Sequence, residues 1–245
     1  MNSSTPLIIT GMHRSGTSLI ARFAHKSGID LGDRLLEAKK SNIHGHYEDI
    51  QILKFHRDIL ERELGHQMWV DHIPLTTARD RELAMALITA RQHKPTWGWK
   101  DPRTCLFLDF WGDLLPDAHF LFVVRNPKLV LSSLGRRGGT RFYQVLTHNV
   151  FMRAWLMYNE ECYRFYMDHP HRCLLLILEH VLEHPTKAVG LLSECLHHRF
   201  EPEVFRSSFD ASVLTRRPKR SLVVSPFLRT KCISLYSKLC QDADL

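Results

Sequence analysis

A short stretch near the start of the chain carries the residues best suited to hold an anion. It reads as an apolar strand, a glycine-bearing loop and the first turn of a helix, with the sequence Leu7-Ile8-Ile9-Thr10-Gly11-Met12-His13-Arg14-Ser15-Gly16-Thr17-Ser18-Leu19-Ile20. Such a turn aims several backbone N–H groups and the positive end of a helix at one point, so it can bind phosphate. The spacing nearly matches the nucleotide-triphosphate loop G-x-x-x-x-G-K-[ST], with Gly11, Gly16 and Ser18 in register. Thr17 stands where that loop has lysine, and Arg14 is the strongest cation, so we expect a phosphate cradle that is not built for ATP.

A second candidate phosphate site follows another apolar run. Arg125-Asn126-Pro127 comes directly after residues 119–124, and Pro127 can open a helix at its first position. Ser133 would then lie about two turns along that helix. A guanidinium at a strand end and a hydroxyl on the next helix can both bond one phosphate. The alternative is an arginine that pairs with a structural carboxylate and a serine on a solvated helix face.

The elements that must position these residues form a recognisable pattern. Short, almost continuously apolar runs predict strands buried on both faces, at residues 7–10, 96–99, 119–124 and 173–178. Longer periodic stretches predict helices, at residues 17–25, 49–60, 79–93, 127–134, 144–167, 185–196 and 230–239. Loops are expected at residues 135–140 and 205–222. The pattern predicts a three-layer, P-loop-like α/β fold with a central, mostly parallel sheet flanked by helices, as a single domain over residues 1–245.

Four polar clusters stand at the predicted strand ends. They comprise residues 14–18, residues 100–103, residues 125–133 and Glu179. Ligands of open parallel sheets bind beyond the carboxyl ends of the strands. The sequence therefore predicts one anion-binding site at this edge of the sheet.

The composition limits the classes of partner that the protein is expected to bind. A formal charge of +7 suits an anion such as a nucleotide, a sulfated or phosphorylated ligand, or nucleic acid. Nucleic acid ranks last, because the basic residues are not interleaved with aromatic residues on one predicted face. The 16 histidines lack the spacing of a zinc site, so no metal is expected. The six cysteines form no C-x-x-C pair, which predicts free thiols. No apolar run has the length of a membrane span, and together these features predict a cytoplasmic protein.

Together these motifs resemble the sulfotransferase family, whose donor is 3′-phosphoadenosine 5′-phosphosulfate (PAPS) and whose nucleotide product is 3′-phosphoadenosine 5′-phosphate (PAP). The segments that carry the resemblance are His13-Arg14-Ser15-Gly16-Thr17-Ser18, Trp99-Lys100-Asp101-Pro102-Arg103-Thr104, and Arg125-Asn126-Pro127 with Ser133. They occur in the family's order and are most similar to the bacterial-type and tyrosyl-protein branches. The C-terminal R-K-G-x-x-G motif of the cytosolic phenol and steroid enzymes is missing from the sequence. The resemblance implies metal-independent transfer of a sulfuryl group to a hydroxyl, of a carbohydrate or another small metabolite.

The resemblance also implies roles for the nucleotide-binding residues. The 5′-phosphosulfate would be held by Arg14, Ser15, Gly16, Thr17 and Ser18. The 3′-phosphate would be held by Arg125 and Ser133. The basic run at residues 216–220 is either a further contact to that phosphate or a solvated face.

The catalytic roles implied are a base and a cation. Glu48, in a segment of the form N-x-x-G-x-x-E, resembles the base of bacterial-type enzymes; His44 and His46 are rival bases. Glu48 could instead lie in the first turn of a helix and stabilise its dipole. Lys100 and Arg14 would stabilise charge on the leaving oxygen.

The sequence leaves several assignments open. Lys100 could pair with Asp101 instead of acting in catalysis, and Arg103 could bind substrate, bind nucleotide or brace the fold. Trp155 and Tyr158 could line the acceptor pocket or belong to the core. The sequence does not indicate an oligomeric state.

Two other function classes stay open beside sulfotransfer. A P-loop kinase or NTPase is disfavoured by Thr17 in the lysine position and by the lack of a clear apolar strand ending in a magnesium-binding aspartate. A non-catalytic nucleotide-binding relative would keep the fold without turnover. The presence of Glu48 and Lys100 argues against that reading.

Overall fold

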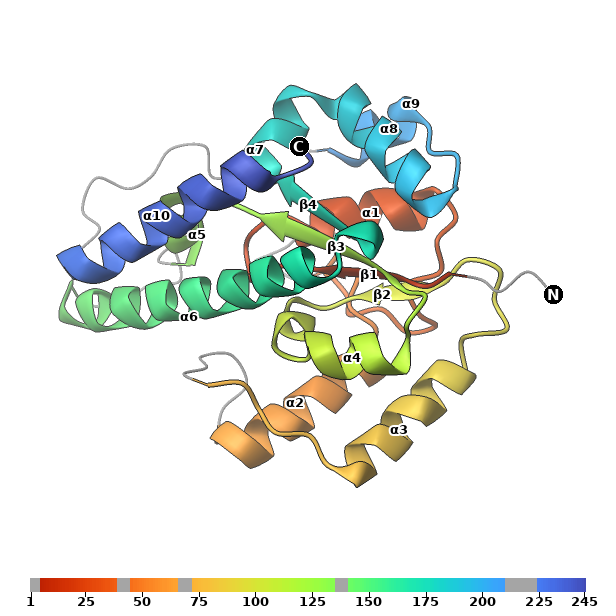
Figure 1. Cartoon of the computed structure of the whole chain (residues 1–245), viewed down its shortest axis with the longest axis horizontal. Coiled ribbons are helices and arrows are strands. Elements are labelled where there is room, and N and C mark those ends of the chain that lie inside the picture. The colour runs from red at the N-terminus through yellow and green to blue at the C-terminus, as the bar shows by residue number, and fades with distance from the viewer. Residues whose placement is uncertain (1–4, 39–44, 66–71, 135–140, 210–223) are drawn as a thin grey trace.

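The computed structural model describes residues 5–38, 45–65, 72–134, 141–209 and 224–245, with the backbone only for residues 141–146. At its centre lies a parallel sheet in the strand order β2-β1-β3-β4. The strands are β1 (Leu7–Thr10), β2 (Gly98–Lys100), β3 (His119–Val124) and β4 (Cys173–Ile177). Helices cover both faces of this sheet, as Figure 1 shows. The predicted α/β fold with a parallel central sheet is therefore confirmed.

Each strand is followed by two or more helical segments. Their bounds are α1 (Thr17–Lys26), α2 (Ile50–Leu64), α3 (Ala78–Thr89), the 3₁₀ turn η1 (Pro102–Leu106), α4 (Leu108–Leu114), α5 (Pro127–Leu134), α6 (Arg141–Asp168), the 3₁₀ turn η3 (Pro170–Arg172), α7 (Leu178–Glu183), α8 (Pro185–Leu196), α9 (Pro202–Ser208) and α10 (Pro226–Asp242). Each of α1, α5 and α7 begins within a few residues of a strand end. The first turns of these helices therefore gather at the carboxyl edge of the sheet.

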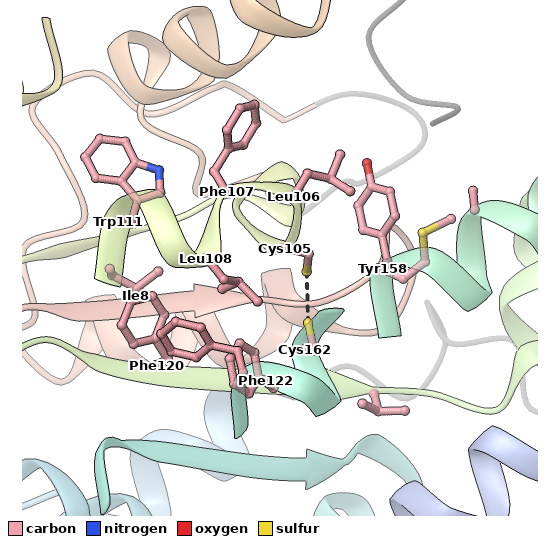
Figure 2. Close-up of a cluster of buried hydrophobic side chains, with 14 of the residues drawn as sticks. Ile8, Cys105, Leu106, Phe107, Leu108, Trp111, Phe120, Phe122, Tyr158 and Cys162 are labelled. Atoms are coloured by element: carbon pink, nitrogen blue, oxygen red, sulfur yellow. Dashed lines mark hydrogen bonds between the residues drawn. The ribbon is translucent and has the colours of Figure 1, made fainter. Parts of the chain in front are cut away.

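Alternate residues of each strand feed two separate cores. Ile8, Phe120 and Phe122 face the first core, which they share with side chains of α2, α4, α6 and α10; Figure 2 shows part of it. Ile9 and Leu121 face the second core, on the opposite face of the sheet, which they share with α1, α7, α8 and α9. Strands that are apolar on both faces are what a sheet covered on both sides requires.

Most predicted bounds are close to those of the structure. The strand predicted at 96–99 lies at Gly98–Lys100, and the strand predicted at 173–178 ends at Ile177 because Leu178 begins α7. The helix predicted at 79–93 ends earlier, at Thr89, and the helix predicted at 230–239 is longer, at Pro226–Asp242.

The loop predicted at residues 205–222 is partly wrong. Residues 205–208 belong to α9, where Phe205 packs into the second core. The rest of that segment from residue 210 on, and the loop predicted at 135–140, lie outside the described residues.

All six cysteines are free thiols. Within the described ranges, no helix is both long and apolar enough to cross a membrane.

Gly98 on β2 lies directly against the backbone of Leu7 on β1. A Cβ at this position would lie 1.8 Å from the carbonyl oxygen of Leu7. Gly98→Ala should therefore push the two strands apart and lower the free energy of unfolding by about 3 kcal/mol, measured by urea denaturation. Gly190→Ala in α8 is the matched control: a Cβ there meets nothing within 4 Å, so stability should hold or rise by about 1 kcal/mol. Equal stabilities of the two variants would contradict the packing described for β1 and β2.

Candidate active site

The loop between β1 and α1 is shaped by two glycines that no other residue could replace without strain. Gly11 and Gly16 have φ angles of +145° and +95°. A Cβ on Gly11 would lie 2.2 Å from the carbonyl oxygen of Val123, and one on Gly16 would lie 2.7 Å from Leu178. Gly16 is also the N-cap of α1, so no cap side chain competes for the first N–H groups of the helix. The loop therefore presents backbone donors to an anion.

The hydroxyl of Ser15 is a polar group of the loop that a bound anion could satisfy. Ser15 is fully buried, and its Oγ has no hydrogen-bond partner in the structure. An unsatisfied buried hydroxyl costs roughly 1–3 kcal/mol, which a bound oxyanion would remove. Arg14, next to it, has a φ of +71°, an unusual conformation for a residue with a side chain. Such conformations cluster at ligand-binding sites.

The predicted residues of the second phosphate site lie against this loop. Arg14 Nε donates to Ser133 Oγ at 2.8 Å, and Arg125 donates to the backbone oxygen of Arg14 at 3.0 Å. The alternative reading of Arg125 holds in part, because its Nε lies 4.0 Å from a carboxylate oxygen of Glu179. Trp155 belongs to the core, and its indole N–H donates to the Arg125 carbonyl at 3.1 Å. Arg14, Arg125 and Ser133 are thus brought together, as predicted.

A buried ion pair also lies against the loop. Lys100 Nζ is 2.6 Å from Glu48 Oε1, and both side chains are less than a tenth exposed. The same ammonium donates to Ser18 Oγ at 3.3 Å and to the backbone oxygen of His46 at 3.2 Å. Arg103 stands 3.7 Å from the second oxygen of Glu48. The predicted base, the predicted cation and the phosphate loop therefore meet at one point.

The backbone around Glu48 is fixed from both sides. Its carbonyl accepts from Leu36 N at 2.7 Å, and the next residue, Asp49, is the N-cap of α2. Asp49 pairs with Arg91 at 2.8 Å, and both side chains are almost fully buried. Glu48 thus precedes α2, and the alternative that placed it in the first helical turn is wrong. The Asp49 cap instead positions the neighbouring carboxylate.

Arg103 is held by a chain of hydrogen bonds whose direction can be worked out. The Trp111 indole N–H, which can only donate, bonds His56 Nε2 at 2.8 Å. His56 therefore carries its proton on Nδ1, which donates to Asp101 Oδ2 at 3.0 Å. The other Asp101 oxygen accepts from the backbone and guanidinium N–H groups of Arg103, each at 2.9 Å. The guanidinium beside Glu48 is thereby oriented by groups that are themselves fixed.

Two pKa shifts follow from this arrangement. Burial tends to raise the pKa of Asp101, but the nearby Arg103 charge and the His56 hydrogen bond outweigh it and hold that pKa well below its ordinary value. Burial tends to lower the pKa of Arg103, and the Asp101 and Glu48 carboxylates raise it instead. Arg103 thus braces the fold through Asp101 and also faces Glu48, the predicted base.

Other predicted site residues fall as follows. His46 contributes its backbone carbonyl to Lys100 and Ser18. Thr17 is buried at the first position of α1. His44 and residues 216–220 lie outside the described residues. Among the side chains that the structure describes, no three His, Cys, Asp or Glu groups gather as metal ligands do.

The Asp101 carboxylate predicts a specific acid dependence of stability. Its folded pKa is lowered, so its contribution is complete above the unfolded value near pH 4 and is lost as pH falls toward the folded value. Between about pH 4 and pH 2, unfolding free energy measured in urea should fall more steeply for the wild type than for Asp101→Asn. The variant should be about 3 kcal/mol less stable at pH 7, because it breaks a buried ion pair. Asp58→Asn, an exposed carboxylate paired with Lys54, should follow the wild type. Parallel profiles for wild type and Asp101→Asn would contradict the assignment.

Comparison with known proteins agrees with the geometry. Solved structures with the same fold include a sulfotransferase from Alicyclobacillus acidocaldarius (TM-score 0.54, 16% identity, covering 96% of this chain and 92% of that one). Others are the sulfotransferase domain from the curacin biosynthetic pathway (0.57, 15%, 96% and 97%) and that of the Synechococcus PCC 7002 olefin synthase (0.54, 16%, 99% and 98%). No sequence among the curated proteins matches significantly. Residues 6–202 match the sulfotransferase family, and the chain therefore belongs to that family.

Proposed function

We propose that this protein transfers a sulfuryl group from PAPS to a hydroxyl of a carbohydrate or another small metabolite. One observation carries the proposal: the Lys100 ammonium lies between the phosphate loop, at Ser18, and a buried carboxylate, at Glu48. A cation and a carboxylate that could serve as a base, both beside this loop, support the proposal. Two of the similar structures are domains from a biosynthetic pathway and an olefin synthase, which supports a small-metabolite acceptor.

The donor would be bound at both of its phosphate positions. The loop donors of residues 14–18, including the unpartnered Ser15 hydroxyl, would hold the 5′-phosphosulfate. Arg125 and Ser133 would hold the 3′-phosphate, and both stand within one hydrogen bond of Arg14. PAP would be the nucleotide product.

Each charged group of the site has one role in the proposed transfer step. PAPS supplies an activated sulfuryl group, whose bond to the nucleotide oxygen breaks as a bond to the acceptor oxygen forms. Glu48 takes the acceptor's proton, and Lys100 with Arg14 stabilises the charge that develops on the leaving oxygen. When the Lys100 ammonium turns toward that oxygen, Arg103 remains beside the Glu48 carboxylate at its second oxygen. Positioning and charge stabilisation suffice in principle for such a loose displacement.

The Lys100 contact also bears on the kinase or NTPase alternative. In that class the loop serine binds magnesium, and the lysine before it reaches the phosphates. Here Thr17 replaces the lysine, and an ammonium from β2 bonds the Ser18 hydroxyl. This arrangement favours sulfuryl transfer over NTP hydrolysis. A cytoplasmic location and a single domain over residues 1–245 stay predictions from the sequence.

Glu48→Gln tests the base. The amide keeps the shape of the side chain but cannot take a proton, so PAP affinity should stay within about twofold while transfer falls at least about 100-fold. Transfer is measured as PAP release from PAPS across a panel of hydroxyl acceptors. Glu82→Gln, an exposed glutamate on α3, is the control and should keep full activity. A fully active Glu48→Gln protein would remove Glu48 as the base.

Arg125→Ala tests the 3′-phosphate assignment. Loss of a charge-assisted hydrogen bond, worth about 1.5–3 kcal/mol, should weaken PAP binding roughly 10- to 100-fold. Adenosine 5′-phosphate, which lacks the 3′-phosphate, should lose far less affinity by calorimetry. Arg206→Ala, at an exposed position on α9, should change neither. Equal losses for the two nucleotides would contradict the assignment.

A further inference from the structure

The hydroxyl of Tyr158 is a buried polar group that the fold does not explain. Tyr158 lies on α6 with its side chain fully enclosed, and its oxygen has no hydrogen-bond partner in the structure. Its ring packs with the first core, and Figure 2 shows the hydroxyl pointing away from the Cys105–Cys162 pair. Phenylalanine would fill the same space without the cost of an unsatisfied hydroxyl. Such a group in a folded protein calls for a ligand or a functional reason.

Two other tyrosines on the same helix show the ordinary arrangement. The Tyr163 hydroxyl donates to Asp242 at 2.5 Å, and the Tyr166 hydroxyl donates to the backbone oxygen of Asp242 at 3.2 Å. Both hydroxyls tie α6 to the end of α10. The difference at Tyr158 is therefore a matter of position along α6, since the residue type is the same.

That position is next to the proposed site. The ring of Tyr158 lies 6.0 Å, centroid to centroid, from the ring of His13 in the phosphate loop. The Arg103 guanidinium and the Asp101 carboxylate are the nearby charges that act on the hydroxyl. Arg103 in turn stands 3.7 Å from Glu48. Tyr158 thus lies where the loop meets the charged groups assigned to transfer.

The Tyr158 hydroxyl is available as a donor. Burial raises its pKa well above the ordinary value, so it keeps its proton at any physiological pH. The Ser15 hydroxyl is in the same condition, buried and without a partner in the structure. Ser15 and Tyr158 thus each leave a buried hydroxyl able to donate, one in the phosphate loop and one next to it.

We propose that the Tyr158 hydroxyl donates a hydrogen bond to an oxygen of the sulfuryl group of the donor. This inference rests on the proposed function and deepens it. The sulfuryl group is the part of PAPS that PAP lacks, and its oxygens are anionic acceptors. The proposed function puts it beside Lys100, Glu48 and Arg103. A hydrogen-bond donor at this place would favour PAPS, which carries the sulfuryl group, over PAP, which lacks it.

Tyr158→Phe tests this without disturbing the packing. Binding of PAPS and of PAP is measured by calorimetry, with no acceptor and no metal, together with the thermal unfolding midpoint. The variant should bind PAPS about tenfold more weakly and PAP within about twofold of the wild type. Its unfolding midpoint should stay the same or rise, because an unsatisfied buried hydroxyl is removed. Tyr166→Phe, the matched control, should lower the midpoint and leave both affinities unchanged.

The outcomes separate the Tyr158 assignment from the proposed function. PAPS affinity in Tyr158→Phe that equals the wild-type value overturns the assignment, and so does a lowered midpoint, which would reveal a structural partner for the hydroxyl. If PAP binds the wild type and only the Tyr158 result fails, the proposed function stands. If the wild type binds neither nucleotide, the proposed function falls, and the Tyr158 assignment falls with it.

Discussion

The ammonium of Lys100, almost fully buried, is the constraint on which the site depends. A charge in the interior costs several kcal/mol unless partners surround it, so the chain must bring them to it. They come from the phosphate loop at Ser18 and from the segment before α2 at His46 and Glu48, while Lys100 itself ends β2. One buried cation thereby joins three segments that are far apart in the sequence. The fixed position of Glu48, and with it the proposed base, follows from this requirement and from the Asp49 cap of α2.

Four charged side chains around Glu48 form an electrically neutral cluster. Glu48 and Asp101 carry two negative charges, and Lys100 and Arg103 carry two positive ones. His56 adds a hydrogen bond without adding a charge, because Trp111 fixes its tautomer. Groups held in this way need little rearrangement when charge develops during a reaction, which is how preorganised sites stabilise a transition state. The proposed transfer uses that preorganisation, with Arg103 remaining beside the base while Lys100 serves the leaving group.

The sequence predicts those parts of this architecture that depend on local pattern. The apolar runs at residues 7–10 and 119–124 become β1 and β3 with the expected bounds, because strands buried on both faces have a composition that a short window shows. The glycine loop and the polar clusters at the strand ends can be predicted to form one site, because parallel strands bring their carboxyl ends to one edge of the sheet. The short helix α4 has no local pattern that would predict it. Its position depends on tertiary contacts, among them those of the buried Trp111.

The pairings within the site could not be predicted in the same way. Lys100 could equally have paired with its neighbour Asp101, and the choice of Glu48 instead depends on where the fold places a residue 52 positions away. The bond from His56 to Asp101 spans 45 positions, and the sequence around His56 has no motif to indicate it. Tyr158 lies on a long aromatic helix, where a ligand-facing hydroxyl and a core ring have the same sequence pattern. Such pairings are set by packing, and only the three-dimensional arrangement separates them.

Calorimetric binding of PAP in the absence of metal tests the central claim most directly, with adenosine 5′-phosphate and ATP with magnesium as comparison ligands. The account predicts tight binding of PAP that depends on its 3′-phosphate and requires no divalent cation. Preference for ATP with magnesium, or no binding of PAP, would contradict it.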